Sequence, residues 1–243
     1  MRLSVLWSMA TSPKFRRHLR EYNAQAVAAG LPPAGRRYKP MLDDATANTG
    51  FDEHYVYHTA WATRILAAER PAQHVDVSSS LYFVALASAI VPVVHLDYRP
   101  AKLAIDGVTC IAGDLMNLPY PDRSLPSLSC MHVVEHVGLG RYGDPIDALG
   151  DRKATAELQR VVAPGGMLLF VTPVGRPQVM FNAHRIYPYE WAVQAFSELK
   201  LEEFSLITDG RNGGELIRHA DPALVGQQKY GCGCYLFRRP TAT

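Results

Sequence analysis

Residues 74–114 read HVDVSSSLYFVALASAIVPVVHLDYRPAKLAIDGVTCIAGD, and this stretch decides the fold. It contains three short apolar runs, HVDVSSS, VVHLDYRP and VTCIAGDL, and a segment, FVALASAI, whose composition suits a helix. Strands that are apolar along their whole length are typical of sheets buried on both faces. Strands that alternate with helices predict a parallel sheet with helices on both sides.

The same alternation continues to the end of the chain. A helix at FDEHYVYHTAWATRILAAERP precedes the first strand, and further helices are expected at 151–163, closed by PGG, and at 187–199. Four more strands are expected at LPSLSCMHVV, MLLFVTPV, 203–208 and 233–238. The last two strands are joined without an obvious helix, which favours an antiparallel pair. We therefore predict an α/β fold with a doubly wound, mostly parallel seven-stranded sheet.

The first fifty residues have a different pattern. A helix is predicted from Pro13 to Ala29, with Ser12 as its N-cap, and the prolines and glycine of 32–40 exclude regular structure after it. We predict an N-terminal helical arm and linker at 1–50 and an α/β domain at 51–243. Such an arm is interpreted as a cover over a pocket or as a dimer contact, which makes a homodimer one hypothesis.

Composition narrows the class of protein. Of the 243 residues 48% are hydrophobic and 20% charged, as in folded globular proteins, and the net charge of +2 gives no reason to expect a nucleic-acid partner. The spacing of the four cysteines fits neither a usual zinc site nor a disulfide framework. No apolar run approaches the roughly 18 residues of a spanning helix. We expect a cytoplasmic protein with reduced thiols and no transmembrane segment.

Acidic residues end three successive predicted strands. Asp76, Asp97 and Asp114 would meet at the carboxyl edge of the sheet, where α/β folds bind ligands. Asp97 follows Asp76 at the distance at which nucleotide-binding folds place a carboxylate for the two ribose hydroxyls. Asp114 would lie beside the adenine. The alternative is that the acids only mark polar strand ends, but three in order favour a nucleotide-like cofactor.

Longer segments resemble known families. GDLMNLPYPDRSLPSLSCMHVVEHVG at 113–138 and ELQRVVAPGGMLLFVTPV at 157–174 resemble the second half of a class I S-adenosylmethionine-dependent methyltransferase. HVDVSSS, EHVGLGRYGDPID and FNAHRIYP resemble the methyltransferase-like family catalogued as domain of unknown function 268. The resemblance implies a Rossmann-like methyltransferase fold and S-adenosyl-L-methionine as cofactor. The residues that we expect to bind the cofactor are Asp76, Ser78, Ser79, Asp97, Asp114, Leu115 and His132.

One segment departs from the methyltransferase pattern. Methyltransferases follow the first strand with a glycine-rich loop, whereas this chain has Ser78, Ser79 and Ser80 there. A serine Cβ restricts positive φ and close approach of the backbone to a ligand. Two further hypotheses follow: a degenerate, non-catalytic methyltransferase fold that serves as a binding or scaffold protein, and a nucleotide-sugar-handling enzyme.

His132, Glu135 and His136 have the H-x-x-E-H spacing of an inverted zinc-protease helix. The residues before them are strand-like, and glycines at 138, 140 and 143 follow at once, which disfavours a helix. We therefore predict that this motif ends the fourth strand at the pocket, and we predict no metal ligands. The alternative is that both histidines only make hydrogen bonds at the strand end.

The predicted reaction is O-methylation of a small-molecule or glycan-type acceptor. Imidazole titrates near neutral pH, so His136 or His184 is expected to be the base, with Glu135 beside it. The expected substrate contacts are Asn182, Arg185, Tyr142 and Asp144. The alternatives are that Asn182 and His184 cap a loop, that Arg185 pairs with Asp144 or Asp147, and that these two acids bind a divalent metal.

Overall fold

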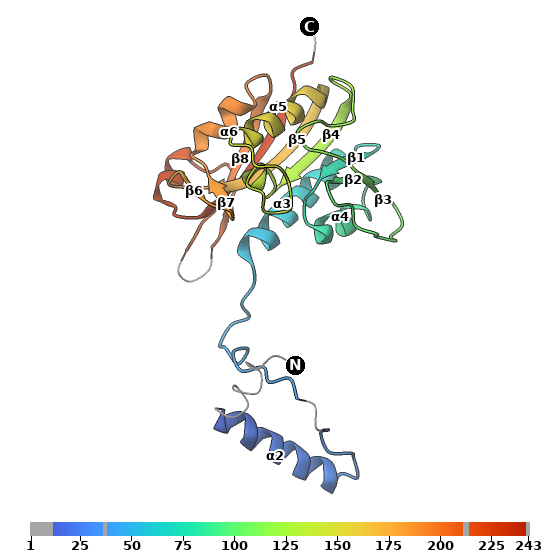
Figure 1. Cartoon of the computed structure of the whole chain (residues 1–243), viewed down its shortest axis with the longest axis vertical. Helices are drawn as coiled ribbons and strands as arrows, with labels where there is room; N and C mark the ends of the chain where they lie inside the picture. The colour runs from blue at the N-terminus through green and yellow to red at the C-terminus, as the bar shows by residue number, and fades with distance from the viewer. Residues whose placement is uncertain (1–11, 36–37, 211–213, 242–243) are drawn as a thin grey trace. The chain divides into compact units, whose positions relative to one another are not determined.

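The computed structural model describes residues 12–35, 38–210 and 214–241. The chain divides into two compact units, Met1–Phe51 and Asp52–Thr243. The first unit contains helix α2 (Pro13–Ala28), drawn in blue in Figure 1. Ser12 Oγ accepts a hydrogen bond from the Phe15 amide and Pro13 occupies the first turn, so the predicted N-cap and helix are confirmed.

The second unit is built on an eight-stranded sheet with the order β3-β2-β1-β4-β5-β10-β8-β9. Its strands are β1 (His74–Val77), β2 (Val93–Asp97), β3 (Val108–Ala112), β4 (Leu125–Met131), β5 (Val162–Val174), β8 (Lys200–Ile207), β9 (Leu216–Ile217) and β10 (Gly231–Arg238). Strands β1 to β5 are parallel, and β10 runs antiparallel to both β5 and β8. The strand order changes direction between β1 and β4, which is where doubly wound sheets open a ligand crevice.

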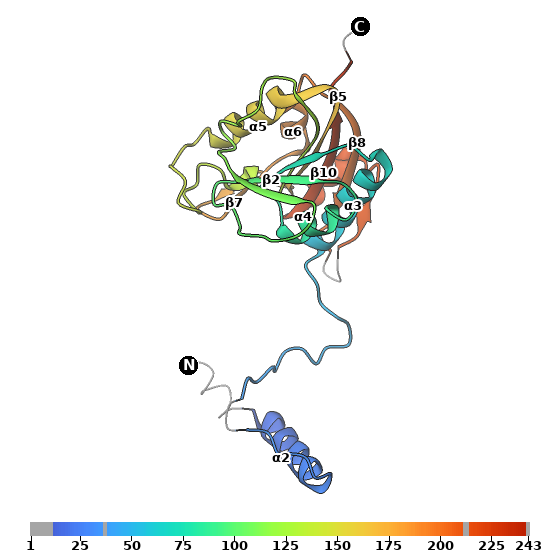
Figure 2. The same cartoon turned by 90° about the vertical axis from the view of Figure 1, so that its right-hand side faces the viewer.

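Helices cover both faces of this sheet. Helices α5 (Gly150–Val161) and α6 (Tyr189–Ala195) lie on one side, and α3 (Glu53–Glu69) and α4 (Leu81–Ala87) lie on the other (Figures 1 and 2). The predicted doubly wound, mostly parallel α/β fold is therefore confirmed. The expected sixth and seventh strands form the antiparallel pair β8–β10.

Four details differ from the sequence prediction. The sheet has eight strands rather than seven, because the two-residue strand β9 pairs with the end of β8. A hairpin of β6 (Gln178–Met180) and β7 (His184–Ile186) follows β5 where a loop was expected. The PGG segment does not close a helix but lies inside β5. Helix α6 is shorter than expected, beginning after Pro188 and ending at Ala195.

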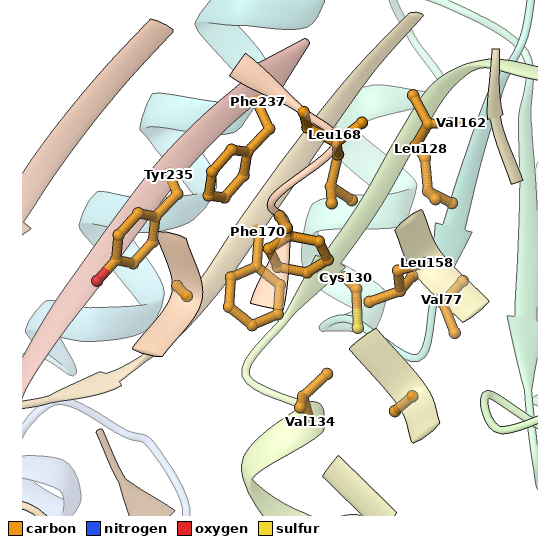
Figure 3. Packing of buried hydrophobic residues seen from close by; sticks show 14 of the residues in the cluster. Val77, Leu128, Cys130, Val134, Leu158, Val162, Leu168, Phe170, Tyr235 and Phe237 are labelled. Atoms are coloured by element: carbon orange, nitrogen blue, oxygen red, sulfur yellow. The ribbon is translucent and has the colours of Figure 1, made fainter. Parts of the chain in front are cut away.

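The two faces of the sheet bury separate hydrophobic clusters. On the α5 and α6 side, Phe170, Tyr235 and Phe237 pack together with Leu158 and are fully buried (Figure 3). On the α3 and α4 side, a second cluster includes the equally buried Leu66 and Phe83. Each such side chain contributes about 1.5–3 kcal/mol through its removal from water. The two clusters hold the sheet rigid beneath its carboxyl edge.

A buried polar contact ties α3 to β8 on the face of the sheet that α3 covers. The Trp61 indole N–H donates to Glu203 on β8 over 2.9 Å, and Ser205 and Arg218 donate to the same carboxylate. Burial opposes ionisation of Glu203, but these hydrogen bonds outweigh it and lower the Glu203 pKa to about 2.

No helix in the described part of the chain is both long and apolar enough to cross a membrane.

Candidate functional site

A cavity of about 340 Å³ lies at the carboxyl ends of β1, β2 and β4. Its walls are Ser78, Asp97, Tyr98, Arg99, Asp114, Leu115, Met116, His132, Val133, His136, Val137, Tyr142, Asp144 and Pro145. This volume is typical of a site for a small organic ligand. Of the fourteen predicted site residues, the structure brings eight into one wall: Ser78, Asp97, Asp114, Leu115, His132, His136, Tyr142 and Asp144.

Two of the three strand-end acids face this cavity. Asp97 Oδ1 accepts the Arg99 amide over 2.6 Å, and Asp114 Oδ1 accepts the Met116 amide over 2.8 Å. Each carboxylate is thus held by the turn that follows its strand, in a fixed position at the wall. Leu115, which is almost fully buried, follows Asp114 in the wall and gives the cavity an apolar patch.

Ser78 adopts the backbone conformation that glycine usually supplies. Its φ is 56°, in the left-handed region, and its amide donates to the Leu96 carbonyl over 2.9 Å. The serine Cβ was expected to restrict positive φ, but Ser78 has a positive φ nevertheless. The loop after β1 therefore reaches the cavity without glycine, at a conformational cost of about 1–2 kcal/mol.

Asp76 and Ser79, which were predicted to be cofactor contacts, lie outside the cavity wall. The Asp76 carboxylate is fully buried and accepts hydrogen bonds from Ser129 Oγ, from the Ser79 amide over 3.1 Å and from His95 Nδ1 over 2.8 Å. Ser79 Oγ accepts the Met131 amide over 3.0 Å. The hydrogen bonds of both side chains hold the loop after β1 against β2 and β4.

Sequence reasoning missed the histidines that complete this buried network. His95 forms an ion pair with Asp76, and His74 bridges Ser127 and Ser129 on β4 over 2.7 and 2.9 Å. Burial favours the neutral form of both Asp76 and His95, but their mutual hydrogen bond outweighs it, so the Asp76 pKa is lowered and the His95 pKa is raised. The sequence did hold a signal for this network, because His74 and His95 stand inside otherwise apolar strands.

Glu135 and His136 lie on η1 (Val134–His136), a single 3-10 turn directly after β4. His136 faces the cavity, its Nδ1 donates to the Ala183 carbonyl over 2.7 Å, and its Nε2 lies 3.8 Å from Glu135 Oε1. Burial lowers the His136 pKa and raises the Glu135 pKa to about 7. Glu135 itself is buried behind the wall. His136 is therefore a neutral imidazole at neutral pH.

The β6–β7 hairpin does not bring its predicted residues to the cavity. Asn182 is exposed and His184 half-buried, and neither belongs to the cavity wall. Arg185 is buried, donates to the Val137 carbonyl over 2.7 Å and lies 3.6 Å from the Asp151 carboxylate. Arg185, which was predicted to be a substrate contact, therefore lies outside the cavity wall and joins the hairpin to α5. Its acidic partner is Asp151 rather than Asp144 or Asp147.

Asp144 organises the loop that follows η1. Its carboxylate accepts the amides of Gly138, Gly140 and Tyr142 over 2.8, 3.4 and 3.2 Å. Burial opposes ionisation here, but these amides outweigh it and lower the Asp144 pKa. Asp147 pairs with Lys153 over 2.6 Å, so each of the two acids has partners of its own.

Sequence reasoning also missed a group of rings around His132. His132 Nδ1 lies 2.9 Å from Glu135 Oε1, and its Nε2 lies 3.3 Å from Cys232 Sγ. The rings of His54 and Tyr55, from the first turn of α3, stack on it with centroids 5.3 and 5.4 Å away. The signal was a run of ring side chains, His54, Tyr55 and His58, spaced to share one face of α3.

Comparisons with known proteins give the fold its name. Residues 123–195 match the model of the family described as "Caenorhabditis protein of unknown function, DUF268". A chain from the complex between the Haloferax volcanii Trm112 methyltransferase activator and a protein assigned as a methyltransferase is similar, with a TM-score of 0.54, 16% identity, and 79% of this chain and 91% of that chain covered. The fold is that of class I methyltransferases. The resemblances predicted from the sequence are confirmed.

Two other solved structures share this methyltransferase fold. The N-methyltransferase NodS from Bradyrhizobium japonicum, in complex with S-adenosyl-L-homocysteine, has a TM-score of 0.51 and 14% identity, with 76% of this chain and 87% of that chain covered. The [4+2]-cyclase SpnF has a TM-score of 0.53 and 16% identity, with 92% of this chain and 93% of that chain covered. No curated protein matches the sequence of this chain.

Proposed function

We propose that this protein is an S-adenosylmethionine-dependent methyltransferase acting on an oxygen of a small-molecule or glycan-type acceptor. One observation carries the proposal: Ser78, Asp97 and Asp114, from the ends of three neighbouring strands, line a single cavity of the right size. The class I fold supports the same reaction class. The similar structure with bound S-adenosyl-L-homocysteine supports the cofactor.

The residues present fit this cofactor. The Asp97 carboxylate offers an acceptor oxygen to the ribose hydroxyls, and Asp114 with Leu115 offers a polar and an apolar contact to the adenine. The left-handed φ of Ser78 is the feature that this fit depends on, because it is a conformation that glycine usually supplies in a loop that approaches a ligand. When bound, S-adenosylmethionine supplies an electrophilic methyl group on its sulfonium.

His136 is proposed as the base that takes the proton of the acceptor hydroxyl. It is neutral at neutral pH, faces the cavity, and is oriented through Nδ1 by the Ala183 carbonyl, which leaves Nε2 as the accepting atom. Glu135, with a pKa of about 7, lies 3.8 Å from that nitrogen and stabilises the imidazolium when it forms. His184 remains the second candidate base, although it lies outside the wall.

The acceptor side of the cavity is formed by Tyr142. The guanidinium groups of Arg99 and Arg141 lie 4.9 and 5.1 Å from the centre of its ring. An aromatic wall beside two cations offers both stacking and hydrogen-bond donors, which suits a hydroxylated ring such as a sugar or a phenol. Asp144 acts by shaping this loop through its three backbone contacts.

Calorimetry with S-adenosyl-L-homocysteine and S-adenosylmethionine tests the cofactor. Asp97→Asn removes the charge that strengthens the ribose contacts, so we expect binding to weaken roughly 10- to 100-fold. Asp106→Asn is the matched control, because Asp106 is exposed and lies outside the cavity wall, and its affinity should equal that of the wild type. No heat from the wild-type protein would refute the proposal.

Transfer of a labelled methyl group to sugar and phenol panels tests the reaction. Cofactor binding without transfer would favour the non-catalytic scaffold or another reaction class, since the similar structure SpnF is described as a [4+2]-cyclase. Stabilisation by nucleotide sugars, and not by S-adenosylmethionine, would favour the nucleotide-sugar enzyme.

A further inference from the structure

Three side chains that bind metals well meet beside the cavity. His54 comes from the first turn of α3, His132 follows β4, and Cys232 lies at the start of β10. One nitrogen or sulfur atom from each lies within 4.8 Å of the other two, and His132 Nε2 lies 3.3 Å from Cys232 Sγ. His132 and Cys232 are buried, and His54 is half-buried. Neither the H-x-x-E-H motif nor the proposed transfer reaction accounts for this group.

One of the two imidazoles, His132, is held by its other nitrogen, as metal-binding histidines are. His132 Nδ1 is bound by the Glu135 carboxylate over 2.9 Å, which directs the lone pair of Nε2 toward Cys232. The His54 ring hydrogen-bonds the Tyr230 main chain. A carboxylate or main-chain carbonyl behind a histidine fixes its tautomer and strengthens it as a metal ligand. A buried cysteine packed against histidine by chance would not need this support.

We propose that His54, His132 and Cys232 bind a thiophilic divalent cation of the Zn²⁺ type. Two imidazoles and one thiolate suit this ion, whose sites with three protein ligands leave a fourth position open. Because His132 also belongs to the cavity wall, the fourth ligand is water or, if the proposed transfer reaction holds, the acceptor oxygen. The three residues come from positions far apart in the sequence, so the site depends on the fold.

The ligand chemistry sets how many protons are released on binding. Zinc takes neutral imidazoles and a thiolate, so an ion that enters this group displaces the Cys232 thiol proton and forms one zinc–sulfur bond. Tetrahedral zinc places its ligand atoms roughly 3.3–3.7 Å apart, so no pair has to close by more than about 1 Å.

The same atoms could instead form a nucleophilic triad of Cys232, His132 and Glu135. That arrangement requires a thiolate that a substrate can reach. Cys232 is fully buried, lies outside the cavity wall and has a raised pKa, all of which disfavour an attacking thiolate. A metal ion needs only room for itself, and it also uses His54, which the triad leaves without a role.

Titration of the full-length, chelator-treated protein with Co²⁺ and then Zn²⁺ tests the site. We expect a thiolate-to-cobalt charge-transfer band in the near ultraviolet, its loss when zinc displaces cobalt, and release of one proton per bound ion. Zinc analysis after gel filtration should find one ion per chain. These readouts do not depend on methyl transfer, so they can fail or succeed independently of the proposed function.

Matched variants locate the ligands. Cys232→Ala should abolish the band, whereas Cys130→Ala, which shortens another fully buried cysteine, should keep it. His54→Gln should weaken cobalt binding at least tenfold, and circular dichroism with a cooperative unfolding transition checks that each variant folds. A band that survives in Cys232→Ala overturns the proposal. So does a wild-type protein that retains no zinc, or one whose Cys232 is alkylated rapidly while no cobalt band forms.

Discussion

At the scale of single residues, the ion pair of Asp76 and His95 makes stability depend on pH. The raised His95 pKa means that the folded state binds its proton more tightly, so this contribution is complete below the usual value of 6.5 and is lost as pH rises through the raised pKa. The lowered Asp76 pKa contributes above 3.8 and is lost as pH falls through the lowered value. The pair therefore stabilises the fold most between pH 3.8 and pH 6.5, where the folded protein carries both charges.

His95→Asn removes the pair and leaves a buried carboxylate without its cation. We expect the free energy of unfolding to fall by about 3–5 kcal/mol near pH 5.5, and the difference from wild type to shrink toward pH 9. Urea unfolding at a series of pH values measures this difference. His18→Asn, at an exposed position of α2, is the control and should leave the pH profile unchanged. A difference that is constant with pH would mean that His95 is neutral in the fold.

The proposed base leads to a second prediction at the same scale. His136→Asn should lower kcat roughly 100-fold or more, with little change in KM, because the base acts only as the acceptor proton leaves. The catalytic imidazole must be unprotonated and its pKa is lowered by burial, so the acid limb of the kcat/KM profile should lie below pH 6.5. His184→Asn should have the smaller effect. The reverse order of the two variants would make His184 the base.

Residues at strand ends were predictable because a parallel sheet fixes where they lie. Asp97, Asp114 and Leu115 were identified from their places in the alternation, and all three face the cavity. Asp76 looked identical in sequence but is fully buried. Asp76 is buried because His95 from β2 and Ser129 from β4 hydrogen-bond to its carboxylate, and the sequence does not show these contacts. The contact of His132 with Cys232 was hidden for the same reason, since it joins β4 to β10.

At the scale of elements, the loop of residues 138–147 depends on two glycines with different surroundings. Gly138 and Gly143 both have positive φ, 78° and 88°. A Cβ on Gly138 would lie 2.0 Å from the Asp147 carbonyl oxygen, whereas a Cβ on Gly143 would have no neighbour within 4 Å. The pair therefore separates the cost of the backbone conformation from the cost of the clash.

Gly143→Ala should lower the free energy of unfolding by about 1–2 kcal/mol, from the backbone conformation alone. Gly138→Ala carries the same cost and must also move the main chain at Asp147, so we expect a loss at least 1–3 kcal/mol larger. Urea denaturation of both variants measures the difference. Equal losses would show that the loop shifts without resistance and that Asp144 does not hold it.

Whole elements were predictable where burial imposes a period, and not elsewhere. Helix α3 and the strands of the parallel sheet have continuous apolar faces and appeared where expected. The β6–β7 hairpin was missed because every residue of β6 is exposed, which leaves no alternation to detect. The PGG segment was read as a helix end from its residue types, but pairing with β4 extends β5 back through it.

At the scale of the whole molecule, everything that builds the cavity lies in one unit. Both hydrophobic clusters, all eight strands of the sheet and every residue of the cavity wall fall within Asp52–Thr243. The alternation of strands and helices made this predictable from the sequence. The arm of residues 1–50 has no such pattern, and its function as a cover or as a dimer contact stays a prediction.

A chain that begins at Asp52 should therefore fold by itself and bind S-adenosyl-L-homocysteine. We expect a single cooperative transition and a rise in Tm with ligand concentration equal to that of the full-length protein, because a ligand that binds only the folded state stabilises it according to its affinity. Thermal unfolding over a ligand series compares the two chains. An unchanged Tm without ligand but a weaker response to it would show that residues 1–51 contribute to the site, as a cover would. A chain that loses its cooperative transition would show instead that the arm belongs to the core.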